Sequence, residues 1–373
     1  MTRREKTPDA RKNPLLDHQP SVLHEFSLNN IETKDKGDEV QIETGGNRLN
    51  DRVEDDFLEL TRDRDANSRR ATGFYQSDRQ DVSKVFMAGY QLQLSAGLGI
   101  VCQVIQNMGA KIENADCKVL IFGMAGTGKS LYPEALMKHI YKNKGVQEFL
   151  QEVKLGNRNM RTDISLFHIP CLEVIKKHKD LISLSAFLDK LEQQIARNLP
   201  AIVFLDELDA FCSERLEQST YTNHWTMNFM KENHDGLAVF GIANHPVVLD
   251  QAVLRQFKYM FYFELPDENT VKDVLAHYKI PYSEEVARKL CTDPVDTGEL
   301  INGCEDVIRF KGNGDRRNLK RINAEELADF IGDYLKMPWK KVVNYESAND
   351  FYIRKARDHL AFWNTRKRIL IGS

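Results

Sequence analysis

The sequence predicts an α/β fold, in which a mostly parallel sheet is flanked by helices and followed by a small all-helical domain. Short apolar runs, each fitting one buried strand, alternate with helical patterns from about residue 116 to residue 266. After Pro266 the apolar runs stop, and only amphipathic helical patterns follow. The expected strands are KVLIF (118–122), DISLFHI (163–169), AIVFLDE (201–207), LAVFGIA (237–243) and YMFYFEL (259–265).

The texture of the chain divides it into five parts. Residues 1–80 are rich in charged residues and Asn and poor in aromatics, which predicts a flexible leader. Residues 81–115 are expected to form N-terminal docking helices, and residues 116–266 the α/β domain. Residues 267–337 predict the helical domain, and residues 338–373 a basic, aromatic helix or tail. For this last part we expect an amphipathic helix packed on the helical domain, with partner or nucleic-acid docking as alternatives.

One uncharged stretch raises the question of a membrane. No Asp, Glu, Lys or Arg occurs between Lys84 and Lys111, a length that could span a bilayer. The stretch carries several Gln and Asn side chains, whose amides are costly in hydrocarbon without partners. A buried or docking helix is therefore favoured over a membrane span.

Bulk composition narrows the class of protein. The formal net charge is −3, with 52 basic and 55 acidic residues, so global charge favours neither nucleic acid nor an anionic membrane. The 6 cysteines are scattered without a CxxC pair, which argues against a zinc ribbon or a disulfide framework. The N-terminus has no apolar segment after its basic residues, so a cytoplasmic location is expected, with export by another signal left open.

A glycine-rich loop follows the first expected strand of the α/β domain. The residues GMAGTGKS match G-x-x-x-x-G-K-[ST] between a predicted strand and a predicted helix. In such a loop, backbone N–H groups and the helix N-terminus bind phosphate, the lysine reaches the β and γ phosphates, and the serine holds Mg²⁺. The residues expected to bind ATP are Gly123, Met124, Ala125, Gly126, Thr127, Gly128, Lys129, Ser130 and Leu131.

Polar residues of the types used in nucleotide hydrolysis stand at the ends of two later expected strands. Asp206 and Glu207 come at the end of a buried run, where carboxylates are costly unless a metal or catalytic water uses them. Asp206 suits the Mg²⁺ shell with Ser130, and Glu207 suits a base for the attacking water. Asn244 ends the next run, and its uncharged amide suits a sensor of the γ-phosphate.

The run from Lys118 to about residue 330 resembles the AAA ATPases. Its segment LDQAVLRQF resembles the second conserved region of katanin and spastin. The phosphate loop, FLDELDA, Asn244 and LDQAVLRQF occur in the order of that family. The residues DTGELINGCEDVIRF and RINAEELADF resemble helices of its lid domain. The resemblance implies a P-loop NTPase fold and an ATPase that remodels an unknown protein or protein complex.

The resemblance also implies sites shared between the subunits of a homo-oligomeric ring, with a hexamer as one candidate size. Arg255 stands where the family carries an arginine finger that acts in trans on a neighbour's γ-phosphate. Katanin and spastin have a second arginine where this chain has Gln256, so trans activation is expected to be weaker or differently built.

Three further departures separate the chain from the family. Met124 and Ala125 stand where two prolines are usual. Residues 142–161 look like an insertion, either a partner surface or simply a longer helix and loop. The segment CLEVIKKHKDLISLS (171–185) should contain the pore loop but has no aromatic residue to grip a polypeptide.

Two alternatives stay open at this point. An ATP-dependent assembly switch or scaffold with little turnover is favoured by Gln256 and by the missing pore aromatic. A clamp-loader-like ATPase acting with nucleic acid is suggested by GNGDRRNLKRIN, which would place Arg317 on the γ-phosphate in cis. Nucleic-acid and membrane partners are both less favoured than a protein partner.

Overall fold

The structure is a computed structural model of the chain. It describes residues 73–75, 85–110, 117–156, 164–212, 217–231, 236–292, 296–310 and 339–371. Residues 1–72 of the expected leader and residues 311–338, which include Arg317, lie outside these ranges.

A six-stranded sheet forms the centre of the α/β part, in the order β1-β3-β4-β5-β2-β6. The strands β3, β4, β5, β2 and β6 pair in parallel, as the sequence predicts, while β1 pairs antiparallel with β3. The strands are β1 (Gly73–Tyr75), β2 (Lys118–Gly123), β3 (Ser165–Pro170), β4 (Ala201–Asp206), β5 (Leu237–Ala243) and β6 (Tyr259–Phe263). Strand β1 falls within the part of the chain expected to be a flexible leader, so the sheet takes in the end of that segment.

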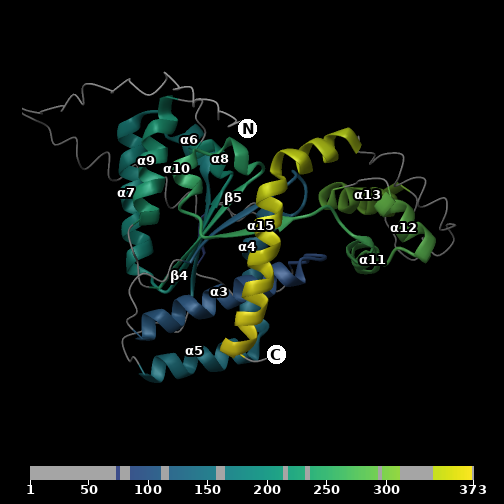
Figure 1. The fold of residues 1–373 in the computed structure, drawn as a ribbon, viewed down its shortest axis with the longest axis horizontal. Helices are drawn as coiled ribbons and strands as arrows, with labels where there is room; N and C mark the ends of the chain where they lie inside the picture. The colour runs from purple at the N-terminus through teal and green to yellow at the C-terminus, as the bar shows by residue number, and fades with distance from the viewer. Residues whose placement is uncertain are drawn as a thin grey trace, which may run out of the picture. The chain divides into compact units, whose positions relative to one another are not determined.

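Helices cover both faces of the sheet and build the lid (Figure 1). Those of the α/β part are α3 (Gln91–Ala110), α4 (Tyr132–Lys142), α5 (Lys144–Gly156), α6 (Cys171–Lys177), α7 (Leu181–Arg197), α8 (Leu208–Phe211), α9 (Glu217–Lys231) and α10 (Gln251–Leu254), with 3-10 turns η1 (Lys129–Leu131) and η2 (Pro246–Val248). The remaining helices are α11 (Glu268–His277), α12 (Glu284–Thr292), α13 (Thr297–Phe310) and the long α15 (Trp339–Ile371).

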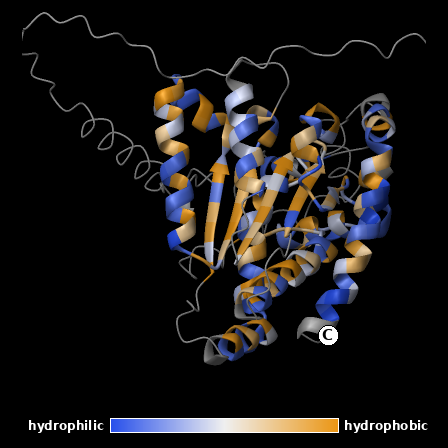
Figure 2. Cartoon of the chain, turned by 60° about the vertical axis from the view of Figure 1, so that its left-hand side comes forward, coloured by the Kyte–Doolittle hydropathy of each residue, from blue (hydrophilic) through white to orange (hydrophobic). Residues whose placement is uncertain are grey.

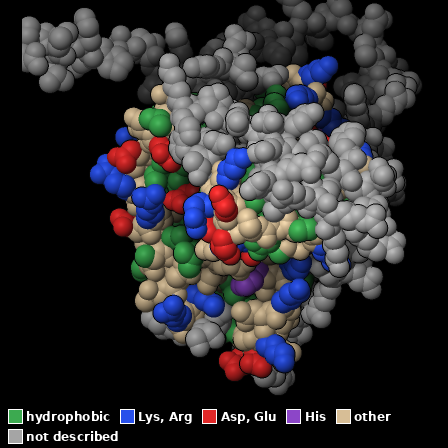
Figure 3. Space-filling model, turned by 90° about the vertical axis from the view of Figure 1, so that its right-hand side faces the viewer, with side chains coloured by type: hydrophobic (Ala, Val, Ile, Leu, Met, Phe, Trp, Pro, Cys, Tyr) green, Lys and Arg blue, Asp and Glu red, His purple; other side chains and the backbone are tan. Residues whose placement is uncertain are grey.

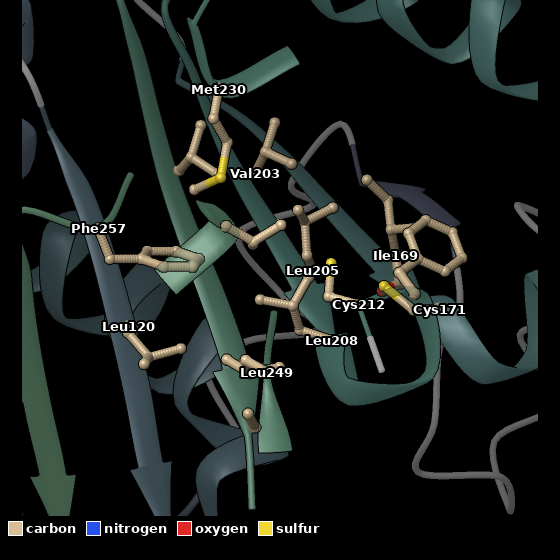
Figure 4. Close-up of a cluster of buried hydrophobic side chains, with 14 of the residues drawn as sticks. Leu120, Ile169, Cys171, Val203, Leu205, Leu208, Cys212, Met230, Leu249 and Phe257 are labelled. Atoms are coloured by element: carbon tan, nitrogen blue, oxygen red, sulfur yellow. The ribbon is translucent and has the colours of Figure 1, made fainter. Parts of the chain in front are cut away.

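Side-chain alternation along the strands separates two hydrophobic cores. On β2, Leu120 and Phe122 belong to the core under α6–α9, while Val119 and Ile121 belong to the core under α3, α4 and α5. Both sets are buried, and the strands are accordingly coloured mostly orange, with a few hydrophilic positions (Figure 2). The first core is dense with aliphatic and sulfur-containing side chains around Leu205 and Cys212 (Figure 4).

Helix α3 belongs to the second core. None of the helices in the described ranges is long and apolar enough to cross a membrane. Two glutamine side chains of α3 have hydrogen-bond partners. Gln93 Nε2 donates to the Tyr262 carbonyl at 3.0 Å, and Gln103 Nε2 donates to Asn107 Oδ1 at 2.8 Å. The boundary expected at residue 116 therefore cuts through a single core.

The insertion expected at 142–161 contains helix α5. Val146 and Leu150 of this helix are buried in the second core, and the helix packs on α3 and α4. Its apolar face is therefore covered by other parts of the chain, which is what the second alternative, a longer helix and loop, predicts. Whether its polar face binds a partner stays a prediction.

Helix α15 packs mainly on the α/β part rather than on the described lid helices, which corrects the expected placement. It lies along α3 and β6. Met260 N–H of β6 donates to His359 Nδ1 at 3.0 Å, and Arg366 Nε donates to Gln103 Oε1 of α3 at 2.8 Å. Trp363 is 2% exposed in the second core. An amphipathic pattern states which face of a helix is buried but not which partner buries it.

The described lid helices have a core of their own. Val274, Leu290 and Cys304, one from each of α11, α12 and α13, are buried together with Ala88 from the segment before α3. The core of the lid thus includes a residue that lies 183 positions or more before its other buried members, since Ala88 packs with residues 271–307. Figure 1 shows the three helices grouped beside the sheet.

Candidate functional site

The glycine-rich loop joins the carboxyl end of β2 to η1 and α4. Gly126 and Gly128 have φ of 82° and 83°, a left-handed conformation that glycine adopts at little cost. A Cβ on Gly123 would lie 2.4 Å from the carbonyl oxygen of Phe263 on β6, so this glycine allows the two strands to approach. Glycine is therefore used in this loop where the backbone is left-handed and where two strands lie close together.

Lys129 lies in the concave side of this loop. Its Nζ donates to the carbonyls of Gly123 and Met124 at 2.8 and 2.7 Å. The side chain is buried, and burial lowers the pKa of Lys129 to about 8, although Asp206, Asp209 and Asp296 act in the opposite direction. The loop thus holds a desolvated cation among carbonyl acceptors, a setting that favours an approaching anion.

Asp206 ends β4 beside the loop. Its Oδ1 accepts the Glu207 N–H at 2.9 Å, its Oδ2 lies 3.1 Å from His168 Nε2, and it is hydrogen-bonded to the Ser130 side chain. Burial alone would raise the pKa of Asp206, but these contacts outweigh it, and the net shift is downward. The carboxylate is therefore ionised and fixed in place at neutral pH.

Glu207 follows in a strained conformation. It has φ 53° and ψ 44°, and it caps the short helix α8. Left-handed backbone at a residue other than glycine costs on the order of 1 kcal/mol and is concentrated at functional sites. The neighbouring Asp209 has its Oδ1 buried without a hydrogen-bond partner in the described part of the chain.

Asn244 comes directly after β5, the strand that lies between β4 and β2 in the sheet. Because β4, β5 and β2 are parallel neighbours, their carboxyl ends bring Asp206, Asn244 and the loop to one edge. The Asn244 carbonyl accepts a hydrogen bond from Tyr345 Oη of α15 at 2.6 Å. Nothing in the sequence pattern indicated that the C-terminal helix reaches this turn.

Arg255 stands apart from this cluster. It is exposed at the end of α10, whose N-terminus is capped by the Asp250 carboxylate accepting from Ala252 N–H at 2.7 Å. Within the described ranges its side chain makes no salt bridge. Gln256 instead turns back on its own helix, where Nε2 donates to the Ala252 carbonyl at 3.3 Å.

Two segments outside the nucleotide-binding motifs also reach the loop, one of them the start of the expected lid helix. A Cβ on Gly128 would have the Met87 methyl as its nearest neighbour, at 4.0 Å, and Phe86 stacks on His277 of the lid with centroids 3.7 Å apart. On the lid side, Gly298 N–H donates to the Gly126 carbonyl at 2.9 Å. The strap at residues 85–90 and the start of α13 therefore both border the phosphate loop.

The segment expected to hold a pore loop has a distinct surface. His178 is buried, stacks on Phe187 and hydrogen-bonds Ser183 through Nδ1 at 2.7 Å. Leu181 and Ile182, at the start of α7, are 52% and 70% exposed. The exposed large hydrophobic residues here are aliphatic, not aromatic, and they follow the exposed charged residues Lys179 and Asp180.

The residues present fit a magnesium nucleotide. A Cβ on Gly128 would meet nothing nearer than 4.0 Å, so there is open space beside this glycine, whereas one on Gly126 would lie 2.2 Å from Asp296. The Ser130 hydroxyl and the Asp206 carboxylate are oxygen ligands of the type that Mg²⁺ prefers, and Mg²⁺ is usually held by one or two such groups. The buried orphan Oδ1 of Asp209 adds a further acceptor near the cluster, suited to a water or cation.

Comparisons with known proteins place this geometry in a family. The sequence model of the ATPase family associated with various cellular activities (AAA) matches residues 119–265. Over these residues the chain is similar to AAA domains. The match covers the phosphate loop, Asp206, Glu207, Asn244 and Arg255 within one AAA domain.

Curated relatives extend this result. Spastin of Danio rerio is 25% identical over 264 residues, which is 65% of this chain and 41% of spastin. Vacuolar protein sorting-associated protein 4B of Mus musculus is 29% identical over 157 residues, 40% of this chain and 30% of that protein. The chain thus spans less than half the length of these relatives.

Solved structures agree on the fold. The FIGL-1 AAA domain in complex with ADP superposes with a TM-score of 0.52 at 17% identity, covering 71% of this chain and 89% of that one. This likeness shows that the α/β sheet with its helical lid is a AAA fold, as predicted.

Proposed function

We propose that the AAA domain binds ATP with Mg²⁺ and hydrolyses it. One observation carries the proposal: the carboxyl ends of the adjacent strands β4, β5 and β2 bring Asp206, Asn244 and Lys129 to one edge of the sheet. An anion-binding loop, a fixed carboxylate and an amide at one edge match the needs of phosphoryl transfer, in which positioning and charge neutralisation dominate.

Binding is assigned to the loop and to α4. Backbone N–H groups of the loop and the N-terminal end of α4 attract the phosphates, and Lys129 leaves its two carbonyl partners for them. Ser130 and Asp206 would hold Mg²⁺, which when bound neutralises charge on the phosphate oxygens. The downward pKa shift of Asp206 keeps this carboxylate ionised for that role.

Hydrolysis is assigned to Glu207 and Asn244. Glu207 follows Asp206 in a left-handed conformation at the end of β4, and we assign it a task other than holding the cation. In this role its carboxylate orients the attacking water and accepts a proton from it. The Asn244 amide hydrogen-bonds the γ-phosphate and the water without adding negative charge.

We also propose assembly into a ring of identical subunits, which the exposed position of Arg255 supports. The guanidinium is exposed at the end of α10, where it is able to reach a neighbouring subunit. The ring size, a hexamer included, and the cytoplasmic location stay predictions. On the described part of the lid face, basic and acidic side chains are interspersed, so that face does not favour nucleic acid as the partner (Figure 3).

The work done is proposed to be remodelling of a protein or protein complex, as the likeness to spastin and to vacuolar protein sorting-associated protein 4B suggests. The second candidate is an ATP-dependent switch with little turnover. It is favoured by Gln256, which is hydrogen-bonded to its own helix and supplies no second cation. Turnover by the assembled protein separates the two.

Two variants test the site. Lys129→Ala is expected to lose binding of a fluorescent ATP analogue, because it removes the one buried cation of the loop. Glu207→Gln is expected to bind the analogue as wild type does and to release no phosphate. Lys142→Ala, which removes an exposed lysine at the far end of α4, is the control and should bind normally. Equal binding by wild type and Lys129→Ala would exclude the assigned loop.

A further inference from the structure

His168 faces the site although no motif marked it. It lies on β3, where strand register pairs His168 with Phe204 and Pro170 with Asp206 of β4. Strand alternation puts Leu166 and Phe204 in the second core, so His168 and Asp206, two residues further along each strand, point to that same face. This is also the face covered by α4, the helix that follows the phosphate loop.

The contact between the two side chains is short and shielded. His168 Nε2 lies 3.1 Å from Asp206 Oδ2, and the side chains are only 11% and 10% exposed. Because an ionised carboxylate only accepts hydrogen bonds, Nε2 is the donor. The other oxygen, Oδ1, accepts the Glu207 N–H at 2.9 Å. Each carboxylate oxygen therefore has its own protein donor.

Such an arrangement fixes the rotation of the carboxylate. Without His168, the Glu207 N–H at Oδ1 and the Ser130 side chain would be the remaining contacts, and Ser130 is itself an expected Mg²⁺ ligand, so the carboxylate could turn more easily about its Cβ–Cγ bond. A donor on Oδ2 that comes from a neighbouring β-strand removes that freedom, because the strand pairing fixes its origin. Outer partners of this kind orient ligating carboxylates, and losing one typically costs about 10- to 100-fold in metal affinity.

We infer that His168 is a positioning residue for the magnesium site: its Nε2–H holds Asp206 in the orientation that binds Mg²⁺ together with Ser130. The inference rests on the proposed function. It assigns His168 no contact with nucleotide and no proton transfer. A histidine that only filled the core would leave the cation requirement unchanged, and this difference is measurable.

The test compares side chains that keep or lose the donor. Glutamine places its Nε2 near the position of the imidazole Nε2, leucine fills the space without a donor, and asparagine has a donor that is too short to reach. Affinity for a fluorescent ATP analogue is measured by titration at a series of Mg²⁺ concentrations and again in EDTA. The control is His359→Leu, which removes another partly buried histidine with one hydrogen bond, far along α15.

We expect His168→Leu to need about 10- to 100-fold more Mg²⁺ for half-maximal tightening of nucleotide binding, while affinity in EDTA changes less than about twofold. His168→Gln should recover most of the wild-type requirement, and His359→Leu should match wild type. If His168→Leu does not fold, as judged by its melting curve, His168→Asn replaces it with the same expectation.

Two results would overturn the inference. One is an unchanged Mg²⁺ requirement in the donor-free variants, and the other is an equal loss of affinity with Mg²⁺ and in EDTA. Failure of the proposed function looks different, because wild type itself would then bind no nucleotide at any Mg²⁺ concentration.

Discussion

Replacement of Tyr345 by phenylalanine tests whether the C-terminal helix supports the Asn244 turn. The Tyr345 hydroxyl donates to the Asn244 carbonyl at 2.6 Å, and its ring lies 4.7 Å from that of His245. Burial raises the pKa of Tyr345, with Tyr262 adding to the shift, so the hydroxyl remains a donor at any working pH. Phenylalanine keeps the ring contacts and removes only the donor.

The expected cost follows from what the carbonyl loses. A neutral hydrogen bond contributes about 1 kcal/mol net, and a buried acceptor left without a partner costs about 1–3 kcal/mol. Asn244 is half buried, so water compensates in part, and we expect about 1–2 kcal/mol off the free energy of unfolding in urea titrations. If that loss also appears in the transition state, kcat for ATP falls by about 5- to 30-fold, while KM stays within about twofold.

Tyr352→Phe is the matched control. Tyr352 lies on the same helix, half-buried, and its hydroxyl has no hydrogen-bond partner within the described ranges. A destabilisation by Tyr345→Phe no larger than that of the control would refute the hydrogen bond. Full destabilisation with unchanged turnover would refute the link between α15 and the proposed sensor.

Three further outcomes are expected. Trp363→Ala should lower the free energy of unfolding by about 3–5 kcal/mol, because it removes a side chain only 2% exposed between α15 and the second core; a loss below 1 kcal/mol by urea titration would contradict the docking. Burial, helped by Lys355 and opposed by Asp358, lowers the pKa of His359, so its contribution to stability is present above about pH 6.5 and is lost as pH falls below that value. His359→Gln should flatten the slope of the unfolding free energy against pH by at most about 1.4 kcal/mol per pH unit. An unchanged slope would contradict the lowered pKa of His359. Arg255→Ala subunits mixed into wild type should lower turnover per wild-type subunit, whereas a constant rate would argue against a finger acting in trans.

The parallel sheet could be predicted because its strands are buried on both faces. Runs such as AIVFLDE and LAVFGIA are apolar throughout, a pattern typical of a sheet with helices on both sides, and their polar ends mark the edge where a site forms. The loop, Asp206, Glu207 and Asn244 were therefore predictable as one cluster, and the structure brings them together.

The contacts that cross between distant segments were not predictable. Strand β1 is only three residues long and lies in a polar stretch, so no periodicity identifies it. His168 reads as one polar residue in an apolar run, and only the pairing of β3 with β4 shows that it faces Asp206. The same holds for Tyr345, whose partner Asn244 lies 101 residues away.

The most direct test of the central claim is steady-state ATP turnover of the purified chain over a range of protein concentrations, with Glu207→Gln as the control. We predict a rate that grows more than linearly with protein concentration and vanishes in Glu207→Gln, since the sites are completed by neighbouring subunits. ATP binding without turnover that depends on Glu207 would contradict hydrolysis at this site and would leave the switch as the function.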